Sequence, residues 1–406
     1  MNNEHIERKE KRCELKNKFI GFISLLGSGV VAAVGFMLIA SQRWSLFDRH
    51  FAAFIILFVQ WQTLGFAVSK IGIEHLIFAV VSNDEKKYFA AGKFIVKTVV
   101  PISAVFSLAV GIVFSPWAGF VALGSIVLDA YSLIIMADLN ARGFYSVTSI
   151  ANLINYPLFF IILFSLNYAG WLNTEVALAA FLISSLLRSL WLARKKYVPA
   201  HFEGFSSDVN LKMGVQQAFN FLMYRMDQIL LSVMGLKAHF DENISMYIYM
   251  AKFPETLASV IVILGTVIFP KAYVQYPFTI RLIGSQFKRY KLFFIGYVPL
   301  FIVLIYAYMK FWNGKSSPYY LAVPFLLNSL LIIFANNITY SMLRQGYLQR
   351  LIVNMLVAVI TGLLLALTIK DGINVYVLSW IVPIQMVTFL ILSLSTKWGK
   401  SIELHA

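Results

Sequence analysis

The chain contains 406 residues, of which 59% are apolar and 13% are charged. A soluble globular domain usually carries about 25% charged residues, so this composition excludes a soluble enzyme and indicates a polytopic membrane protein. The formal net charge is +15. It gives no reason to expect a nucleic-acid partner, because basic residues collect on the cytoplasmic side of membrane proteins.

Long apolar stretches divide the sequence into about twelve candidate transmembrane helices. A stretch of about 18 or more apolar residues is long enough to cross a bilayer as a helix. The first six lie at residues 19–41, 51–69, 94–114, 117–138, 147–167 and 174–193. The second six lie at residues 213–235, 245–270, 291–312, 318–340, 351–369 and 373–395. The expected fold class is therefore an all-α polytopic membrane protein.

Connectors rich in Lys and Arg alternate along the chain with connectors that are poor in charge. One set of alternate connectors, together with both tails, contains 24 of the 34 Lys and Arg residues, whereas the other set contains 6. The remaining four lie inside spans. Because basic connectors stay on the cytoplasmic side, the sequence predicts that both termini are cytoplasmic.

Two pairs of similar dipeptides indicate an internal repeat of about half the chain. Leu64-Gly65 matches Leu264-Gly265, and Gly143-Phe144 resembles Gly346-Tyr347. Repeats with an even number of spans have the same orientation in the membrane, so we expect two six-helix lobes around a central cavity. The expected parts are a basic cytoplasmic tail (1–18), an N-terminal lobe (19–193), a cytoplasmic linker (194–212), a C-terminal lobe (213–395) and a cytoplasmic tail (396–406).

Three ionisable residues lie inside spans of the N-terminal half and are candidate substrate-binding residues. Ionisable groups at bilayer depth are costly and commonly mark a functional site. Lys97 and Arg188 lie near the cytoplasmic ends of their spans, from where both side chains can snorkel to the interface. Asp129 lies near the middle of its span, where a carboxylate must be protonated or paired. For Asp129, a structural hydrogen bond and a functional site are equally good interpretations.

The densest group of charges lies in the seventh and eighth spans. Arg225 and Asp227 belong to the seventh span, and Lys252 and Glu255 belong to the eighth. Antiparallel packing around a turn near residue 240 places Arg225 level with Glu255, and it places Asp227 level with Lys252. Arg225 and Asp227 are two residues apart, so they point to different sides of the helix.

Two interpretations of this cluster follow from its chemistry. The four charges can neutralise each other within the helix pair. Alternatively, one cation remains available for an anionic headgroup. Arg225 is the best candidate for that role, because a guanidinium group binds phosphate bidentately and does not lose its proton. Such a cluster could also relay a proton or another ion, which would couple transport to a gradient.

Enzyme motifs and cofactor sites are absent from the sequence. No Gly-rich phosphate-binding loop ends in Lys-Ser/Thr. The six histidines are scattered, with none at metal-ligand spacing. Cys13 is the only cysteine, which excludes an internal disulfide and a cysteine-based metal cage. The sequence therefore predicts a transporter with no cofactor rather than an enzyme.

The seventh and eighth spans carry a motif that resembles bacterial polysaccharide exporters. Arg225-Met226-Asp227 is followed by an apolar run, like the Arg-x-Asp motif of that family. After the turn, the family shows an aromatic residue, an alanine, an acidic residue and a closing proline, here Tyr249, Ala251, Glu255 and Phe269-Pro270. The chain thus resembles the O-antigen and capsule repeat-unit flippases. These form the polysaccharide-transport branch of the multidrug/oligosaccharidyl-lipid/polysaccharide exporter superfamily.

This resemblance implies a V-shaped fold with a cationic cavity in a multi-pass protein of the bacterial inner membrane. The implied activity is the movement of undecaprenyl-pyrophosphate-linked oligosaccharide repeat units from the cytoplasmic to the periplasmic leaflet. The family motif is matched by Arg225, Asp227 and Glu255. Lys252 is not part of the motif and is added because it lies at a similar depth in the membrane. One departure is Ser245 or Met246, which stands where the family has a glycine and affects only the turn.

The partners that the resemblance implies are the lipid-linked oligosaccharide and membrane lipids. A polysaccharide polymerase and a chain-length regulator also fit as protein partners. No cofactor is implied, and coupling to a proton or sodium gradient fits the charge cluster.

Two other classes of membrane protein remain as alternatives. A cation or drug antiporter of the same fold would favour unpaired carboxylates in its cavity, whereas this cluster mixes both signs. A membrane O-antigen polymerase would need a sizeable external loop carrying Arg or His. The predicted external connectors are short and together hold six basic residues, so the flippase is the favoured interpretation.

Overall fold

The computed structural model describes most of the predicted spans, and the described residues are mainly helical. It covers residues 27–28, 30–32, 34–39, 46–70, 73, 94–141, 145–194, 207–235, 247–248, 250–251, 291–308, 321–344, 346–368 and 375–395. Within these ranges there is no β-strand. The predicted all-α class is therefore confirmed.

After helical positions at residues 27–28, 30–32 and 34–39, the described N-terminal half contains six helices and one π-helical turn. They are α2 (Arg49–Ser69), η1 (Ile95–Val99), α5 (Val100–Val113), α6 (Pro116–Ala141), α7 (Tyr145–Ile154), α8 (Tyr156–Tyr168) and α9 (Thr174–Ala193). The predicted span at 147–167 is divided into α7 and α8. Its break lies at Asn155, whose backbone leaves the helical region two residues before Pro157. Proline cannot donate to the preceding turn, so a break here is expected on physical grounds.

Five helices make up the described C-terminal half. They are α10 (Ser207–Gly235), α13 (Lys291–Tyr308), α14 (Ala322–Arg344), α15 (Leu348–Ala366) and α16 (Val375–Ser395). Helix α10 begins inside the segment that the sequence assigns to the linker. The predicted span at 245–270 lies outside the described residues, apart from helical positions at 247–248 and 250–251. Among the described residues, seven helical stretches are long and apolar enough to cross a membrane.

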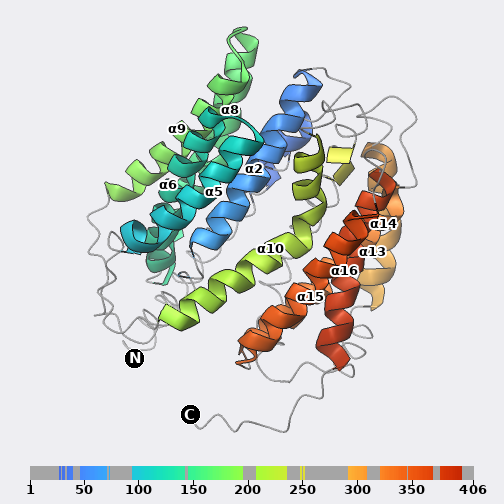
Figure 1. Cartoon of the computed structure of the whole chain (residues 1–406). Coiled ribbons are helices and arrows are strands. Elements are labelled where there is room, and N and C mark those ends of the chain that lie inside the picture. The colour runs from blue at the N-terminus through green and yellow to red at the C-terminus, as the bar shows by residue number, and fades with distance from the viewer. Residues whose placement is uncertain are drawn as a thin grey trace, which may run out of the picture.

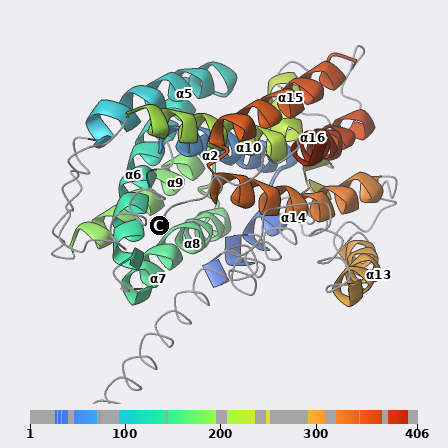
Figure 2. The same ribbon diagram turned by 90° about the horizontal axis from the view of Figure 1, so that it is seen from below.

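The helices form two groups, with α10 between them (Figure 1). In the first group α6 packs against α2, α5 and α9, and in the second group α16 packs against α14 and α15. Helix α10 packs against α2 on one side and against α15 and α16 on the other. Seen from below, α5 and α13 lie on opposite sides of the molecule (Figure 2). Two helical groups agree with the predicted two-lobe architecture.

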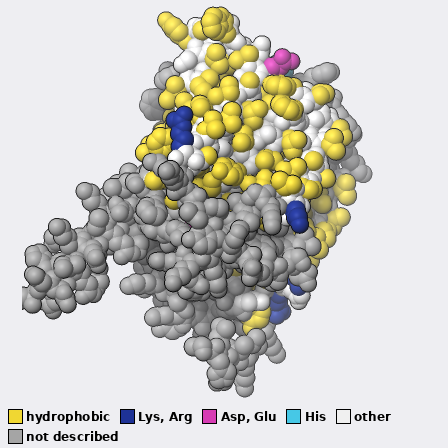
Figure 3. Space-filling view, turned by 90° about the vertical axis from the view of Figure 1, so that its left-hand side faces the viewer, with side chains coloured by type: hydrophobic (Ala, Val, Ile, Leu, Met, Phe, Trp, Pro, Cys, Tyr) yellow, Lys and Arg dark blue, Asp and Glu magenta, His cyan; other side chains and the backbone are white. Residues whose placement is uncertain are grey.

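The outer surface of the first group is apolar. Leu108 and Ile112 on α5 are 69% and 87% exposed, which is the pattern of a helix that faces lipid tails. Hydrophobic side chains also cover most of the described part of the face in Figure 3. Near the turn between α8 and α9, Tyr168 and Trp171 are 96% and 74% exposed. Exposed Tyr and Trp at helix ends are typical of the membrane interface.

Cysteine labelling can test the predicted orientation, because Cys13 is the only native cysteine. Helix α9 has 20 residues and is about 30 Å long, so its two ends lie at opposite interfaces. In a Cys13→Ser background, Tyr168→Cys should react with a membrane-impermeant maleimide in intact cells. Arg194→Cys should react only after the membrane is permeabilised. The opposite pattern would reverse the topology.

The hairpin of α5 and α6 depends on a close approach of backbones at two glycines. A Cβ atom at Gly119 would lie 2.7 Å from the Ser107 carbonyl oxygen and 3.0 Å from the Gly111 Cα. Both neighbours are backbone atoms, so they cannot rotate away.

We expect Gly119→Ala to lower the free energy of unfolding by about 1–3 kcal/mol through overpacking, seen as a lower melting temperature in detergent. The matched control is Gly296→Ala on α13, where nothing lies within 4 Å of the added atom. Equal melting temperatures for the two variants would show that the hairpin tolerates a wider separation.

Candidate functional site

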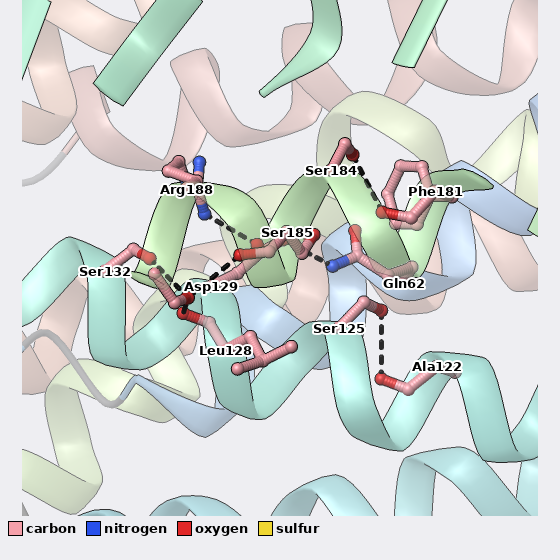
Figure 4. A network of polar contacts seen from close by, with 11 residues as sticks. Gln62, Ala122, Ser125, Leu128, Asp129, Ser132, Phe181, Ser184, Ser185 and Arg188 are labelled. Carbon is pink, nitrogen blue, oxygen red and sulfur yellow. Dashed lines mark hydrogen bonds and ion pairs between the residues drawn. The ribbon is translucent and has the colours of Figure 1, made fainter. Parts of the chain in front are cut away.

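A buried cluster of polar side chains joins three helices of the first group. Asp129 on α6 accepts a hydrogen bond at 2.6 Å from the Arg188 guanidinium on α9, and the two groups form an ion pair. The Gln62 amide on α2 donates to the other oxygen of the same carboxylate at 2.9 Å. Figure 4 shows Asp129 between Arg188 and Gln62. Asp129 and Arg188 are each only 7% exposed, so the ion pair is shielded from solvent.

Serine hydroxyls extend this cluster along α6 and α9. Ser132 and Ser189 are joined by a hydrogen bond of 2.9 Å, and Ser189 also lies 3.0 Å from the Leu128 carbonyl oxygen. Ser185 is fully buried, and its hydroxyl has no hydrogen-bond partner within the described part of the chain. The interface between α6 and α9 is therefore polar over more than one helical turn.

These contacts change the interpretation of two residues in the N-terminal half. Arg188 was expected to snorkel to the interface, but it is buried and bonded to Asp129. The prediction was wrong because it treated Arg188 alone, whereas a carboxylate 59 residues earlier in the chain lies within hydrogen-bond distance of its guanidinium group. The sequence required a partner for the Asp129 carboxylate if it is charged, and Arg188 is that partner in the structure. Lys97 is exposed in η1 and takes no part in this cluster.

The second group of predicted site residues lies partly in α10. Asp227 is 4% exposed and accepts a hydrogen bond of 2.5 Å from the hydroxyl of Tyr247. The Tyr247 ring in turn packs against Phe325 of α14, with 5.6 Å between ring centroids. Lys252 and Glu255 lie outside the described residues. The expected pairing of these two residues with Asp227 and Arg225 therefore stays a prediction.

Arg225 lies on a different side of α10 from Asp227. Ser232 follows Arg225 by seven residues, which is close to two helical turns, so both occupy the same face. The Trp61 indole N–H on α2 donates to the Ser232 hydroxyl at 2.6 Å. The face of α10 that carries Arg225 is therefore the one that turns toward the N-terminal helices. Arg225 is half-buried there, at the boundary between the two helical groups.

Sequence reasoning missed Gln62, Tyr247 and the Trp61–Ser232 contact. Each of these side chains is neutral, and neutral polar residues inside an apolar span have no distinctive signal in the sequence. A charge at mid-bilayer could have prompted a search for such partners, since a buried carboxylate needs hydrogen-bond donors.

Comparison with solved structures shows a fold similar to that of several membrane transporters. No family model matches this sequence, and no curated protein matches it. An inward-facing multidrug-resistance MATE family transporter of the MOP superfamily aligns with a TM-score of 0.54 and 12% identity over 90% of this chain and 92% of the other. A MATE protein in a straight conformation aligns with a TM-score of 0.53 and 12% identity, over 91% and 92% of the two chains.

A third match is a MOP superfamily transporter from Pyrococcus furiosus described as having a binding pocket of reversed polarity. It aligns with a TM-score of 0.52 and 14% identity over 93% of this chain and 94% of the other. At these identities the likeness concerns the fold. The chain has the fold of these MATE transporters.

The buried ion pair predicts a strong coupling between Asp129 and Arg188. Asp129→Asn or Arg188→Met alone leaves one buried charge without its partner, which should cost about 3–5 kcal/mol of stability. Combining the two substitutions removes both charges and keeps an acceptor for Gln62 at position 129. The double variant should recover more than half of the loss in melting temperature. If its loss equals the sum of the two single losses, the charges do not interact in the folded protein.

Proposed function

We propose that this protein is a flippase that moves undecaprenyl-pyrophosphate-linked oligosaccharide repeat units across the bacterial inner membrane by alternating access. The fold supports transport, because MATE family transporters with a similar fold have been described in inward-facing and outward-facing conformations. The observation that carries the substrate class is the position of Arg225, a half-buried cation on the α10 face that turns toward the N-terminal helices.

The mechanism that we propose is physical rather than chemical. A sugar headgroup with two phosphates cannot cross hydrocarbon alone, because its desolvation is too costly. Arg225 would bind the phosphate oxygens bidentately at the boundary between the helical groups, while the prenyl tail stays in lipid. Rocking of one group against the other then changes the side on which the headgroup is accessible. No covalent bond forms or breaks.

The N-terminal ion pair favours this substrate over a cationic drug. A cation antiporter needs a carboxylate that is available to its substrate or coupling ion. Asp129 is already bonded to Arg188 and Gln62, so it is poorly placed for that role. Coupling of the proposed flippase to a proton or sodium gradient would depend on the C-terminal cluster instead.

Deletion of the gene in the producing bacterium should cause lipid-linked repeat units to accumulate while surface polymer disappears. We expect the wild-type chain to restore export and Arg225→Gln to reduce it at least about tenfold, since a charged hydrogen bond to phosphate is lost. Arg225→Lys should retain part of the activity. The matched control is Arg350→Gln, which alters an exposed arginine at the start of α15.

Other outcomes would point to other functions. If no lipid-linked unit accumulates on deletion, export is not the activity and the antiporter becomes the better hypothesis. If single units reach the surface without being polymerised, the protein acts as a polymerase. If Arg225→Gln exports as well as the wild type, Arg225 is structural.

A further inference from the structure

The hydrophobic core of the described chain changes with depth in the membrane. One large cluster of buried side chains contains residues from both helical groups, among them Phe58 of α2, Phe181 of α9, Leu231 of α10 and Leu378 of α16. We call it the shared cluster. The predicted topology places every member of this cluster at or outward of the middle of its span. The two groups are therefore joined by apolar packing on the side of the periplasm.

Closer to the cytoplasm, each buried cluster belongs to one group alone. Met223, Ile338, Met355 and Phe389 belong to a cluster that α10 forms with α14, α15 and α16. Two smaller clusters lie toward the inner ends of the helices of the first group. None of these inner clusters contains described residues of both groups. The packing therefore indicates a conformation that is closed on the outer side.

Helix α10 changes its neighbours along its length in the same way. Near its middle, the Tyr224 hydroxyl donates to Asn336 Oδ1 on α14 at 2.9 Å. Near its outer end, the Ser232 hydroxyl accepts the Trp61 indole N–H of α2 at 2.6 Å. The middle of α10 thus contacts the second group, and its outer end is bonded to the first group.

Arg225 lies at the depth where this change occurs. Met223 belongs to an inner cluster, whereas Met226 belongs to the shared cluster. Ser232 lies about two turns outward from Arg225 on the same face of α10. The shared cluster and the bond between Trp61 and Ser232 therefore stand between Arg225 and the periplasm.

We propose that the shared cluster is a closed periplasmic gate and that the hydrogen bond between Trp61 and Ser232 is its latch. The proposal rests on the alternating access of the proposed function but not on the identity of the substrate. An anionic headgroup at Arg225 cannot pass outward through packed apolar side chains, because it would lose its hydration there. Release to the periplasm requires this gate to open, and in the closed state Arg225 is reached from the cytoplasm.

The direction and burial of the bond between Trp61 and Ser232 suit it to this role. Apolar packing is non-directional, whereas an indole N–H must point at its acceptor. Ser232 is fully buried, and its hydroxyl donates to the Ile229 carbonyl oxygen at 2.6 Å, so its oxygen is oriented to accept from Trp61. Gln62, the next residue of α2, bonds to Asp129. The latch therefore connects α10 to the part of α2 that is fixed within the first group.

Two single-cysteine reporters in a Cys13→Ser background measure the gate from its two sides. Leu231→Cys reports on the gate itself, because Leu231 is fully buried in the shared cluster. Ala218→Cys reports on the inner side, because Ala218 is half-buried and lies two turns inward from Arg225 on the same face. The rate of reaction with a membrane-impermeant maleimide is measured in intact cells for Leu231→Cys and in inside-out membrane vesicles for Ala218→Cys.

Trp61→Phe removes the indole N–H and keeps an aromatic ring. We expect it to raise the reaction rate of Leu231→Cys about three- to fivefold, since the loss of one neutral hydrogen bond shifts the equilibrium between closed and open gate by about this factor. The rate of Ala218→Cys should fall, because less of the protein then occupies the closed state. Ser232→Ala should have the same effects, and the two substitutions together should do no more than the larger single effect.

The matched control is Trp117→Phe on α6. The Trp117 indole N–H donates to the Glu175 carbonyl oxygen of α9 at 3.3 Å, so this bond lies within the first group. Its loss should change neither reaction rate.

Three outcomes would overturn the proposal. If Leu231→Cys with an intact Trp61 reacts as fast as the exposed Tyr168→Cys, no gate is closed on the outer side. If the effects of Trp61→Phe and Ser232→Ala add, their bond is not a latch. If either substitution raises the rates of both reporters, it loosens the whole protein instead of opening a gate.

Neither labelling measurement uses a substrate, so its result is independent of the export assay with Arg225→Gln. The expected labelling rates together with normal export by Arg225→Gln would support the gate and refute the proposed substrate site. Failure of the labelling prediction together with loss of export in Arg225→Gln would refute the gate and leave the proposed function standing.

Discussion

The packing of the N-terminal helices depends on the neutralisation of charge inside the membrane. Asp129, Arg188 and Gln62 come from α6, α9 and α2, and all their contacts are within 2.9 Å. An uncompensated buried charge costs several kcal/mol, so these helices must keep the register that brings the three side chains together. The hydrogen bond between Ser132 and Ser189 imposes the same register one turn along α6. We infer that α2, α6 and α9 move as one unit.

Helix α2 connects this unit to α10 through adjacent residues with different roles. Gln62 bonds to Asp129 within the unit, whereas Trp61 bonds to Ser232 on α10. A rocking motion that separates the two helical groups would break the second contact and leave the first intact. A neutral hydrogen bond contributes about 1 kcal/mol, far less than a buried ion pair costs when broken. Of these contacts, the weaker one therefore lies at the boundary between the groups and the stronger one lies inside a group.

Much of the fold could be predicted from the sequence, because hydropathy decides which segments cross a bilayer. Helices α2, α6 and α9 begin and end within a few residues of the predicted spans. The start of α10 at Ser207 was missed, since its first turns are polar and read as part of a linker. The division of one span at Asn155 was also missed, although Pro157 gave a signal for it.

The site was less predictable than the fold. Depth along a span can be counted from the sequence, and it correctly required a partner for Asp129. The identity of that partner depends on which helices are neighbours, and this is decided by packing over the whole lobe. Arg188 was therefore assigned to the interface, although it pairs with Asp129. Helical periodicity did place Arg225 and Asp227 on different sides of α10, because that separation is a local property of the helix.

The two polar sides of α10 explain why this helix differs from its neighbours. It is absent from the seven described stretches that are apolar enough to cross a membrane on composition alone, yet it packs between both helical groups. Polar residues are tolerated in such a helix when they face protein or a water-filled space rather than lipid. One side presents Arg225 toward the N-terminal helices, and another presents neutral groups toward α14.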